Sequence, residues 1–264
     1  MTGSVHRVRV LLRCARAVLA LTALLAMAAP WLCLPAHSHA RRALAAAGWQ
    51  VLLAGFGIRI RRHGAPADPA GALIVANHVS WTDIAVLGRL LDAGFVAKAE
   101  VAGWPIIGTL ARRYGCLFVA RDSRAAAHRV AAEMNAYRAG SGLVLFAEGT
   151  TGEGDGVLPF RSGLFAAGAR WPRIQPVTIA YARADGGVLS PRERRHVAWI
   201  ADDALLPHAM ALAASGGVTV DVWFEESFAA PNRKQAAEAS RRLIASRLAQ
   251  IQEAAQAATL KRAA

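Results

Sequence analysis

Two apolar stretches open the chain. Residues 17–36 run for twenty residues without a charge, about the length that crosses the core of a bilayer. Residues 40–58 are apolar again over a shorter stretch that three glycines interrupt. Because Pro30 would kink a helix, the pattern predicts either one spanning helix or two helices that enter a single leaflet and return.

From residue 72 onward, short apolar runs typical of β-strands alternate with stretches such as residues 123–140, where apolar residues recur at helical spacing. This alternation predicts an α/β fold with a mixed, mainly parallel sheet flanked by helices. An N-terminal two-helix membrane-anchoring segment would precede it, joined by a linker over residues 61–71. The predicted strands are residues 72–76, 94–98, 116–120, 142–147, 174–181, 196–201 and 218–225.

The end of the chain reads as one amphipathic helix. Its predicted apolar face consists of Leu243, Ile244, Leu248 and Ile251. We therefore expect three parts: a membrane-associated helical segment (1–58), an α/β domain (59–230), and a C-terminal amphipathic helix packed on or beside that domain (231–264).

The net charge of +13 is concentrated at the N-terminus. Residues 1–62 hold nine arginines and no acidic residue, so they contribute +9, and the rest of the chain contributes +4. A basic segment around an apolar one fits an anionic lipid surface better than nucleic acid. We expect membrane lipids as partners and no nucleic acid.

Other features restrict the chemistry. The three cysteines are scattered and the histidines do not pair at metal-ligand spacing, so we expect no disulfide framework and no metal. No G-x-S-x-G turn occurs, so a serine nucleophile lacks its usual setting. The arginine-rich start and the small residues ending at Ala40 also imitate a secretory signal, which leaves a secreted hydrolase as an alternative.

A first candidate site follows the strand at 72–76. His78 and Asp83 lie in a turn that opens a helix, the position where α/β sheets build their sites. A neutral imidazole is a suitable base for a hydroxyl proton, and a carboxylate on its other nitrogen would fix the tautomer. From the residues alone, a polar turn in which Asp83 or Ser80 caps the helix remains the alternative.

A second candidate lies at residues 143–168. Glu148, Gly149 and Thr150 follow a strand, and the N–H groups of that turn together with Arg161 could hold an anion or an oxyanion. Arg121 directly follows the strand at 116–120. A solvent loop and an ordinary salt-bridge partner are the alternatives for these residues.

In this order, the blocks resemble the lysophospholipid acyltransferase family, the bacterial 1-acyl-sn-glycerol-3-phosphate acyltransferases, over about residues 50–230. The N-H-x4-D block of that family is matched by Asn77, His78 and Asp83. Its G-x-x-F-x-x-R block is matched by Gly115, Phe118 and Arg121. Its F-P-E-G-T-R block is matched in part by Phe146, Glu148, Gly149 and Thr150, and its proline-centred strand by residues 174–180.

The resemblance implies transfer of a fatty acyl group from acyl-CoA or acyl-carrier protein to a lysolipid hydroxyl, without a cofactor. It implies His78 as general base and Asp83 as its orienting partner. It also implies a position at the cytoplasmic face of the inner membrane. The implied substrate-binding residues are Asn77, Arg121, Glu148, Gly149, Thr150, Thr151 and Arg161.

Two departures from the family pattern affect the acceptor. Ala147 replaces the usual proline, and Thr151 stands where phosphatidate-forming members have arginine. The loop is similar to the subgroup that acylates lyso-ornithine lipid, whose cationic amine would tolerate the nearby Glu153 and Asp155. Because Arg161 could supply the missing charge, both 1-acyl-sn-glycerol-3-phosphate and lyso-ornithine lipid stay open. A basic lipid-binding protein without chemistry is a further alternative.

Overall fold

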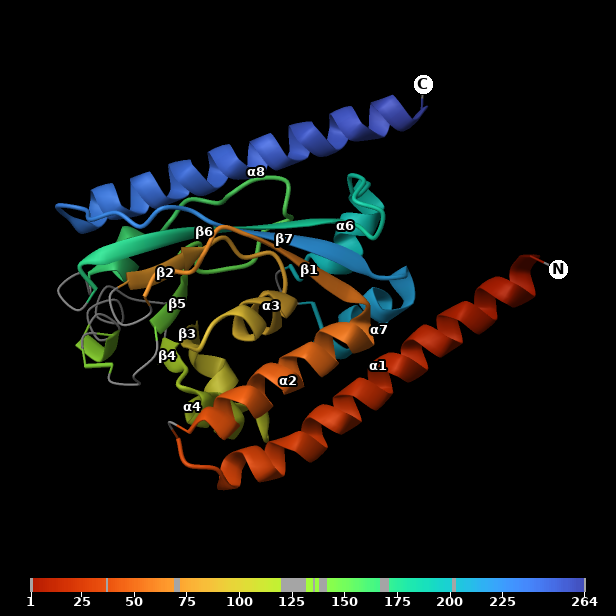
Figure 1. Ribbon diagram of the computed structural model, residues 1–264, viewed down its shortest axis with the longest axis horizontal. Helices are drawn as coiled ribbons and strands as arrows, with labels where there is room; N and C mark the ends of the chain where they lie inside the picture. The colour runs from red at the N-terminus through yellow and green to blue at the C-terminus, as the bar shows by residue number, and fades with distance from the viewer. Residues whose placement is uncertain are drawn as a thin grey trace.

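The computed structural model describes residues 2–36, 38–68, 72–119, 132–134, 136–137, 142–166, 171–200 and 203–263. Its strands are β1 (Ile58–His63), β2 (Ala72–Ala76), β3 (Ala93–Lys98), β4 (Leu117–Val119), β5 (Gly142–Phe146), β6 (Arg173–Arg183) and β7 (Val218–Phe224). These seven strands form one sheet in the order β1-β7-β6-β2-β5-β3-β4 (Figure 1).

The sheet is mixed and mainly parallel, which confirms the predicted fold class. Only the β6–β7 pair is antiparallel among the described strands. β2 lies in the middle, with Val75 opposite Leu145 of β5 on one side and Pro176 of β6 on the other. The carboxyl ends of β2 and β5 therefore meet at the same edge of the sheet, where the two predicted sites begin.

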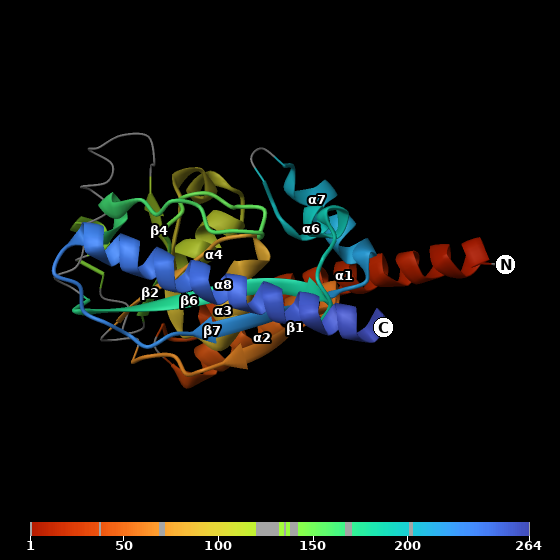
Figure 2. The same ribbon diagram turned by 90° about the horizontal axis from the view of Figure 1, so that it is seen from above.

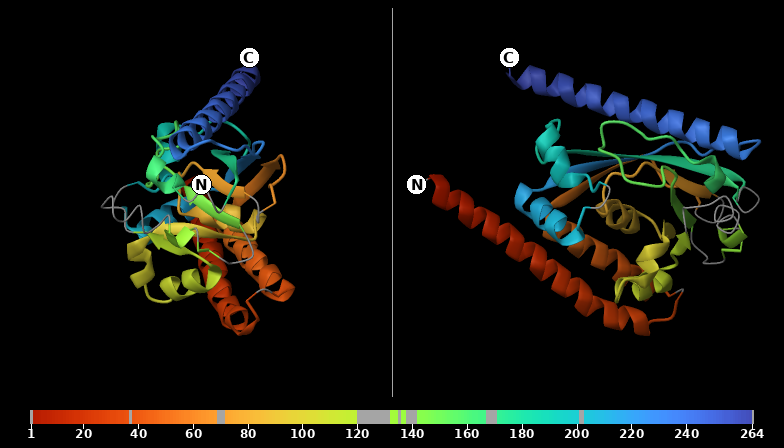
Figure 3. Two further views of the ribbon diagram at one scale, coloured as in Figure 1. Left: turned by 90° about the vertical axis from the view of Figure 1, so that its left-hand side faces the viewer. Right: turned by 180° about the vertical axis from the view of Figure 1, so that it is seen from behind.

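Helices cover both faces of the sheet. The described helices are α1 (Thr2–Cys33), α2 (His39–Phe56), α3 (Thr82–Leu90), α4 (Ile107–Tyr114), α6 (Pro191–Val197), α7 (Leu205–Ser215) and α8 (Arg233–Ala263), with short 3-10 helices η1 (Ala99–Gly103) and η2 (Ser162–Phe165). α8 lies on one side of the sheet and α1, α2 and α3 on the other (Figures 1 and 3). The predicted helix at 123–140 falls mainly outside the described residues.

Three predictions about elements were wrong. In the predicted strand at 196–201, the described residues 196–200 are not a strand, because the Ser190 capping box with Glu193 sets a helix that runs through Val197. β1 occupies residues for which the sequence predicts the end of an apolar segment and a linker. The alternation of Ile58 and Ile60 with arginines is the pattern of a strand. Leu243 is 39% exposed, whereas Ile244 and Leu248 of the same helix are buried.

α1 and α2 pack closely against each other and against the sheet domain. Leu53 and Phe56 of α2 are buried in the core cluster that includes the strand residue Ile74. α1 is continuous through Pro30, and its N-terminal end projects beyond the sheet (Figure 2). Within the described chain, Ser4–Cys33 is the one helix that is long and apolar enough to cross a membrane by length and composition, which suggests membrane association.

Replacing Gly55 with alanine is expected to lower stability, because α1 and α2 touch there. A Cβ added to Gly55 would lie 2.2 Å from the Cβ of Ala20, closer than two carbon atoms can approach. Helix propensity alone would make the alanine variant more stable by about 1 kcal/mol. The expected fall of about 1–3 kcal/mol in the free energy of unfolding would therefore come from overpacking of the two helices. Denaturation in detergent measures it, with Gly103→Ala as control because no atom lies within 4 Å of a Cβ there. Equal stability of both variants would contradict the packing.

Candidate active site

His78 lies in the turn after β2 and is held on two sides. Its Nδ1 is 2.8 Å from Oδ2 of Asp83, and its ring stacks on Phe146, the last residue of β5, at 4.0 Å between centroids and 15° between planes. The side chain is 13% exposed. The imidazole is therefore fixed in orientation while one part of it reaches the surface.

Asp83 both orients His78 and holds the turn together. Besides the imidazole, Oδ2 accepts the backbone N–H groups of Val79 at 2.7 Å and Ser80 at 2.9 Å. The side chain is fully buried. The helix that follows has Trp81 at its N-cap and no side-chain cap, so Asp83 holds the turn and orients the histidine instead of capping the helix.

The second ring nitrogen of His78 is the group available for chemistry. When Nδ1 donates to Asp83, a neutral imidazole has its lone pair on Nε2. Among the described residues, Nε2 has no hydrogen-bond partner. Nε2 can accept a proton from a hydroxyl group, and Asp83 would stabilise the resulting imidazolium.

Tyr181 is a site residue that sequence reasoning missed. It lies on β6, and its hydroxyl donates to Oδ1 of Asp83 at 2.5 Å and is 2.8 Å from Oγ1 of Thr82. Burial, followed by the nearby Asp83 charge, raises the pKa of this phenol well above its usual value, so the hydroxyl keeps its proton. Tyr181 lies far from the H-x4-D block along the chain, so no local pattern pointed to it.

Tyr181→Phe is expected to lower kcat about tenfold and leave the KM for the acceptor unchanged. The substitution removes a hydrogen bond to the charged Asp83, and such a bond contributes about 1.5–3 kcal/mol. Without it, Asp83 and His78 are held less firmly in position. Steady-state kinetics measure the effect. The matched control is Tyr137→Phe, which removes a hydroxyl bonded to the Gly115 carbonyl, at 3.0 Å, instead of to Asp83. A kcat equal in both variants would contradict the assigned role.

Glu148 fastens the second turn to the first. Its Oε1 accepts the N–H of His78 at 2.8 Å, and its Oε2 accepts the N–H of Leu158 at 3.0 Å. The Gly152 N–H in turn donates to the His78 carbonyl at 2.8 Å. Burial raises the pKa of Glu148 to about 7. Both carboxylate oxygens contact backbone, so Glu148 positions the histidine turn.

Asn77, which the sequence predicts to contact substrate, bonds to strand β6 through both ends of its amide. Its Nδ2 donates to the Ile179 carbonyl at 2.9 Å, and its Oδ1 accepts the Ile179 N–H at 2.8 Å. The side chain is fully buried. Asn77 therefore joins the turn to β6, and its contact with substrate stays a prediction.

Of the remaining predicted residues, Gly149, Thr150, Thr151 and Arg161 lie in or against the second turn. Gly149 has φ +75°, and Arg161 covers it, since a Cβ on Gly149 would lie 2.7 Å from Nε of Arg161. Thr150 is exposed. The Thr151 hydroxyl donates to the Trp199 carbonyl, so it ties the turn to the segment after α6. Arg121 lies outside the described residues.

The chemistry available at this edge is proton transfer at Nε2 of His78, and the exposed Arg161 lies against the Gly149 turn. Within the described residues, no three His, Cys, Asp or Glu side chains gather as metal ligands would.

Comparisons with known proteins identify relatives of this chain. A family model described as Acyltransferase matches residues 59–180. The chain is 39% identical over 180 residues to the lyso-ornithine lipid O-acyltransferase of Brucella abortus, covering 65% of this chain and 67% of the relative. It is 36% identical over 219 residues to the enzyme of the same name from Rhizobium meliloti, covering 80% and 75%.

A solved structure has the same fold. The 1-acyl-sn-glycerophosphate (LPA) acyltransferase PlsC from Thermotoga maritima superposes with a TM-score of 0.64, over 93% of this chain and 97% of that one, at 16% identity. This likeness supports the mixed, mainly parallel sheet and its flanking helices.

Proposed function

The chain belongs to the acyltransferase family, and on that premise we propose that it transfers a fatty acyl group from a thioester to the hydroxyl of a lysolipid. The observation that carries the proposal is the His78 imidazole, which is held by Asp83 and Phe146 and keeps Nε2 open. The donor is acyl-CoA or acyl-carrier protein, and no cofactor takes part.

The proposed reaction is a direct transfer. Nε2 of His78 takes the proton of the acceptor hydroxyl, while the oxygen of that hydroxyl attacks the carbonyl carbon of the thioester. The carbon–sulfur bond then breaks, and the proton on Nε2 passes to the leaving thiolate. Asp83 holds the ring in one tautomer and stabilises its charged form. The products are the acylated lipid and a free thiol.

We propose lyso-ornithine lipid as the acceptor. Thr151 offers no charge for a phosphate, and its hydroxyl is engaged by the Trp199 carbonyl. The names of the Brucella and Rhizobium relatives support the same acceptor. Lysophosphatidate is the second candidate, because Arg161 lies across the Gly149 turn and could receive a phosphate. Purified enzyme incubated with labelled acyl-CoA and each lysolipid separates the two, and product from neither would contradict acyl transfer.

Thr151→Arg is expected to raise kcat/KM for lysophosphatidate relative to lyso-ornithine lipid by about tenfold, since charge-assisted bonds to a phosphate contribute about 1.5–3 kcal/mol. Thr151→Val is the control, because it removes the hydroxyl without adding a charge. The same acceptor ratio in both variants and the wild type would count against a role of this position in head-group choice.

We propose that α1 lies along the leaflet surface. Its inner side contacts the rest of the chain from Arg13, which donates to the Ala214 carbonyl at 3.1 Å, to Trp31, which stacks on Tyr114 of α4. A helix crossing the bilayer would draw α4, with its exposed Arg112 and Arg113, into hydrocarbon. The opposite side is apolar and exposed, at Val8, Leu11, Leu12, Val18, Leu19 and Leu25.

This attachment favours retention of the N-terminus over cleavage of a signal peptide. Ala17, Ala20 and Trp31 of α1 are buried against the rest of the chain. We place the enzyme at the cytoplasmic face of the inner membrane, where acyl thioesters are made. A mature protein that begins at Arg41 would contradict this and favour a secreted hydrolase.

A further inference from the structure

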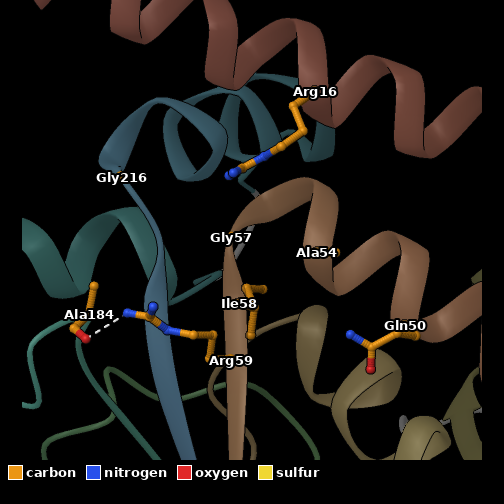
Figure 4. A pocket seen from close by; sticks show the side chains of 8 residues that line it. All are labelled: Arg16, Gln50, Ala54, Gly57, Ile58, Arg59, Ala184 and Gly216. Atoms are coloured by element: carbon orange, nitrogen blue, oxygen red, sulfur yellow. Dashed lines mark hydrogen bonds between the residues drawn. The ribbon is translucent and has the colours of Figure 1, made fainter.

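A cavity of about 320 Å³ opens where α1, α2 and the start of β1 meet the end of α7. Figure 4 shows Arg16 reaching from α1 toward the Gly57 turn, and Arg59 extending toward Ala184 on the other side of β1. No acidic residue lines the cavity, whose walls are Arg16, Gln50, Ala54, Gly57, Ile58, Arg59, Ala184 and Gly216.

Both arginines keep most of their hydrogen-bonding capacity. Arg16 donates through Nε to the Gly55 carbonyl at 3.0 Å, and Arg59 donates through Nη2 to the Ala184 carbonyl at 2.7 Å. Within the described chain, neither forms an ion pair with a carboxylate. A guanidinium has five N–H groups, so each arginine can still donate to an anion.

The balance of charge around the cavity is positive. The carboxyl ends of α2 and α7 point here, and each contributes roughly half a negative charge. Arg16 and Arg59 contribute two positive charges, which leaves an excess of about +1. An adjoining cavity of about 240 Å³ differs, because the charges of its Arg13 and Arg183 are balanced by Asp185 and Glu193, which lie 3.6 and 3.8 Å from Arg183. The excess charge therefore belongs to the first cavity.

The cavity also lies at a depth in the membrane that suits contact with lipid phosphates. This inference rests on the attachment of α1 to the leaflet surface proposed above. Arg16 extends from α1 toward the end of α2, on the same side as the buried Ala17 and Ala20, whereas Val18 and Leu19 face outward. When the outward side enters the acyl region, the inward side faces the layer of lipid phosphates.

We propose that this cavity binds the phosphate of an anionic phospholipid head group, separately from the acceptor site at His78. Arg16 and Arg59 donate to the phosphate oxygens from opposite walls through charge-assisted hydrogen bonds. A bound lipid would fix the orientation of α1 and the sheet domain on the leaflet. Free phosphate compounds, including the phosphates of CoA, share this chemistry and form the other arm of the test.

The test compares Arg59→Gln with Arg62→Gln in the full chain in detergent. Both variants remove one charge from β1, but Arg62 is exposed and does not line the cavity. The melting midpoint is measured against short-chain phosphatidylglycerol, short-chain phosphatidylcholine, inorganic phosphate and CoA.

Phosphatidylglycerol is expected to raise the melting midpoint of the wild type and of Arg62→Gln. The same rise in Arg59→Gln is expected to require a concentration of this lipid at least about tenfold higher. Equal responses of the two variants, or no response of the wild type, would overturn the site. A response to inorganic phosphate or CoA but not to phosphatidylglycerol would overturn its assignment to lipid. The melting experiment contains no acyl acceptor, so its result does not depend on acyl transfer. A failed transfer assay would contradict the proposed function and leave the result on lipid binding unchanged.

Discussion

Replacing His78 with alanine is expected to lower kcat for acyl transfer by about 10²–10⁴-fold, the usual contribution of a general base. The chain should stay folded, because Asp83 keeps its bonds from Val79, Ser80 and Tyr181 after the imidazole is lost. Transfer of labelled acyl groups and the melting midpoint, measured on the same preparation, separate lost chemistry from lost folding.

The chain provides a matched control in a second histidine–carboxylate pair. His63 on β1 lies 2.8 Å from Oδ1 of Asp221 and stacks on Trp223 at 4.1 Å, so its surroundings resemble those of His78. His63→Ala is expected to keep full transfer activity. Equal losses in both variants, or an active His78→Ala enzyme, would remove His78 from the role of base.

Among substitutions that keep the size of the side chain, Asp83→Asn is expected to be the most damaging to stability and activity. Oδ1 of Asp83 accepts from Tyr181, and Oδ2 accepts from His78, Val79 and Ser80. An amide replaces one oxygen by a donor, so at least one buried N–H or O–H loses its acceptor, at a cost of about 1–3 kcal/mol. His78 would also lose the partner that fixes its tautomer, with an expected fall in kcat of about 10²–10⁴-fold.

Denaturation and kcat are both measured for this variant, beside Asp221→Asn. Asp221 is buried and accepts from Arg61 at 2.9 and 2.6 Å as well as from His63. The control is therefore expected to lose stability and keep kcat. If Asp83→Asn lost only stability, the carboxylate would be a turn-holding group without a part in the reaction.

The sequence allowed prediction of elements whose signals are local. Residues 72–76 and 142–146 are unbroken apolar runs because β2 and β5 are buried on both faces. The short spacing between His78 and Asp83 also predicted that they lie together. By contrast, β1 carries four basic residues in six and was missed, since its Arg61 becomes compatible with the sheet only through Asp221, far along the chain.

Contacts between distant segments explain the other differences. The sequence does not predict the two hydrogen bonds between Asn77 and Ile179, because the two residues lie far apart along the chain. Tyr181 appeared to be one more residue of an apolar strand, and only the β2–β6 pairing brings its hydroxyl to Asp83. Residues 198–200 were read as strand because Trp199 and its neighbours are apolar, yet Trp199 donates its N–H to Val79 beside the histidine.

The central claim is that His78 activates the acceptor hydroxyl for direct attack on the thioester. Rapid mixing of enzyme with acyl-CoA, with and without lyso-ornithine lipid, tests it most directly by following free CoA. We expect CoA release only when the acceptor is present, in equal amount with acylated lipid, and no release in His78→Ala. A burst of CoA equal to the enzyme concentration without acceptor, with an acyl group bound to the protein, would contradict it.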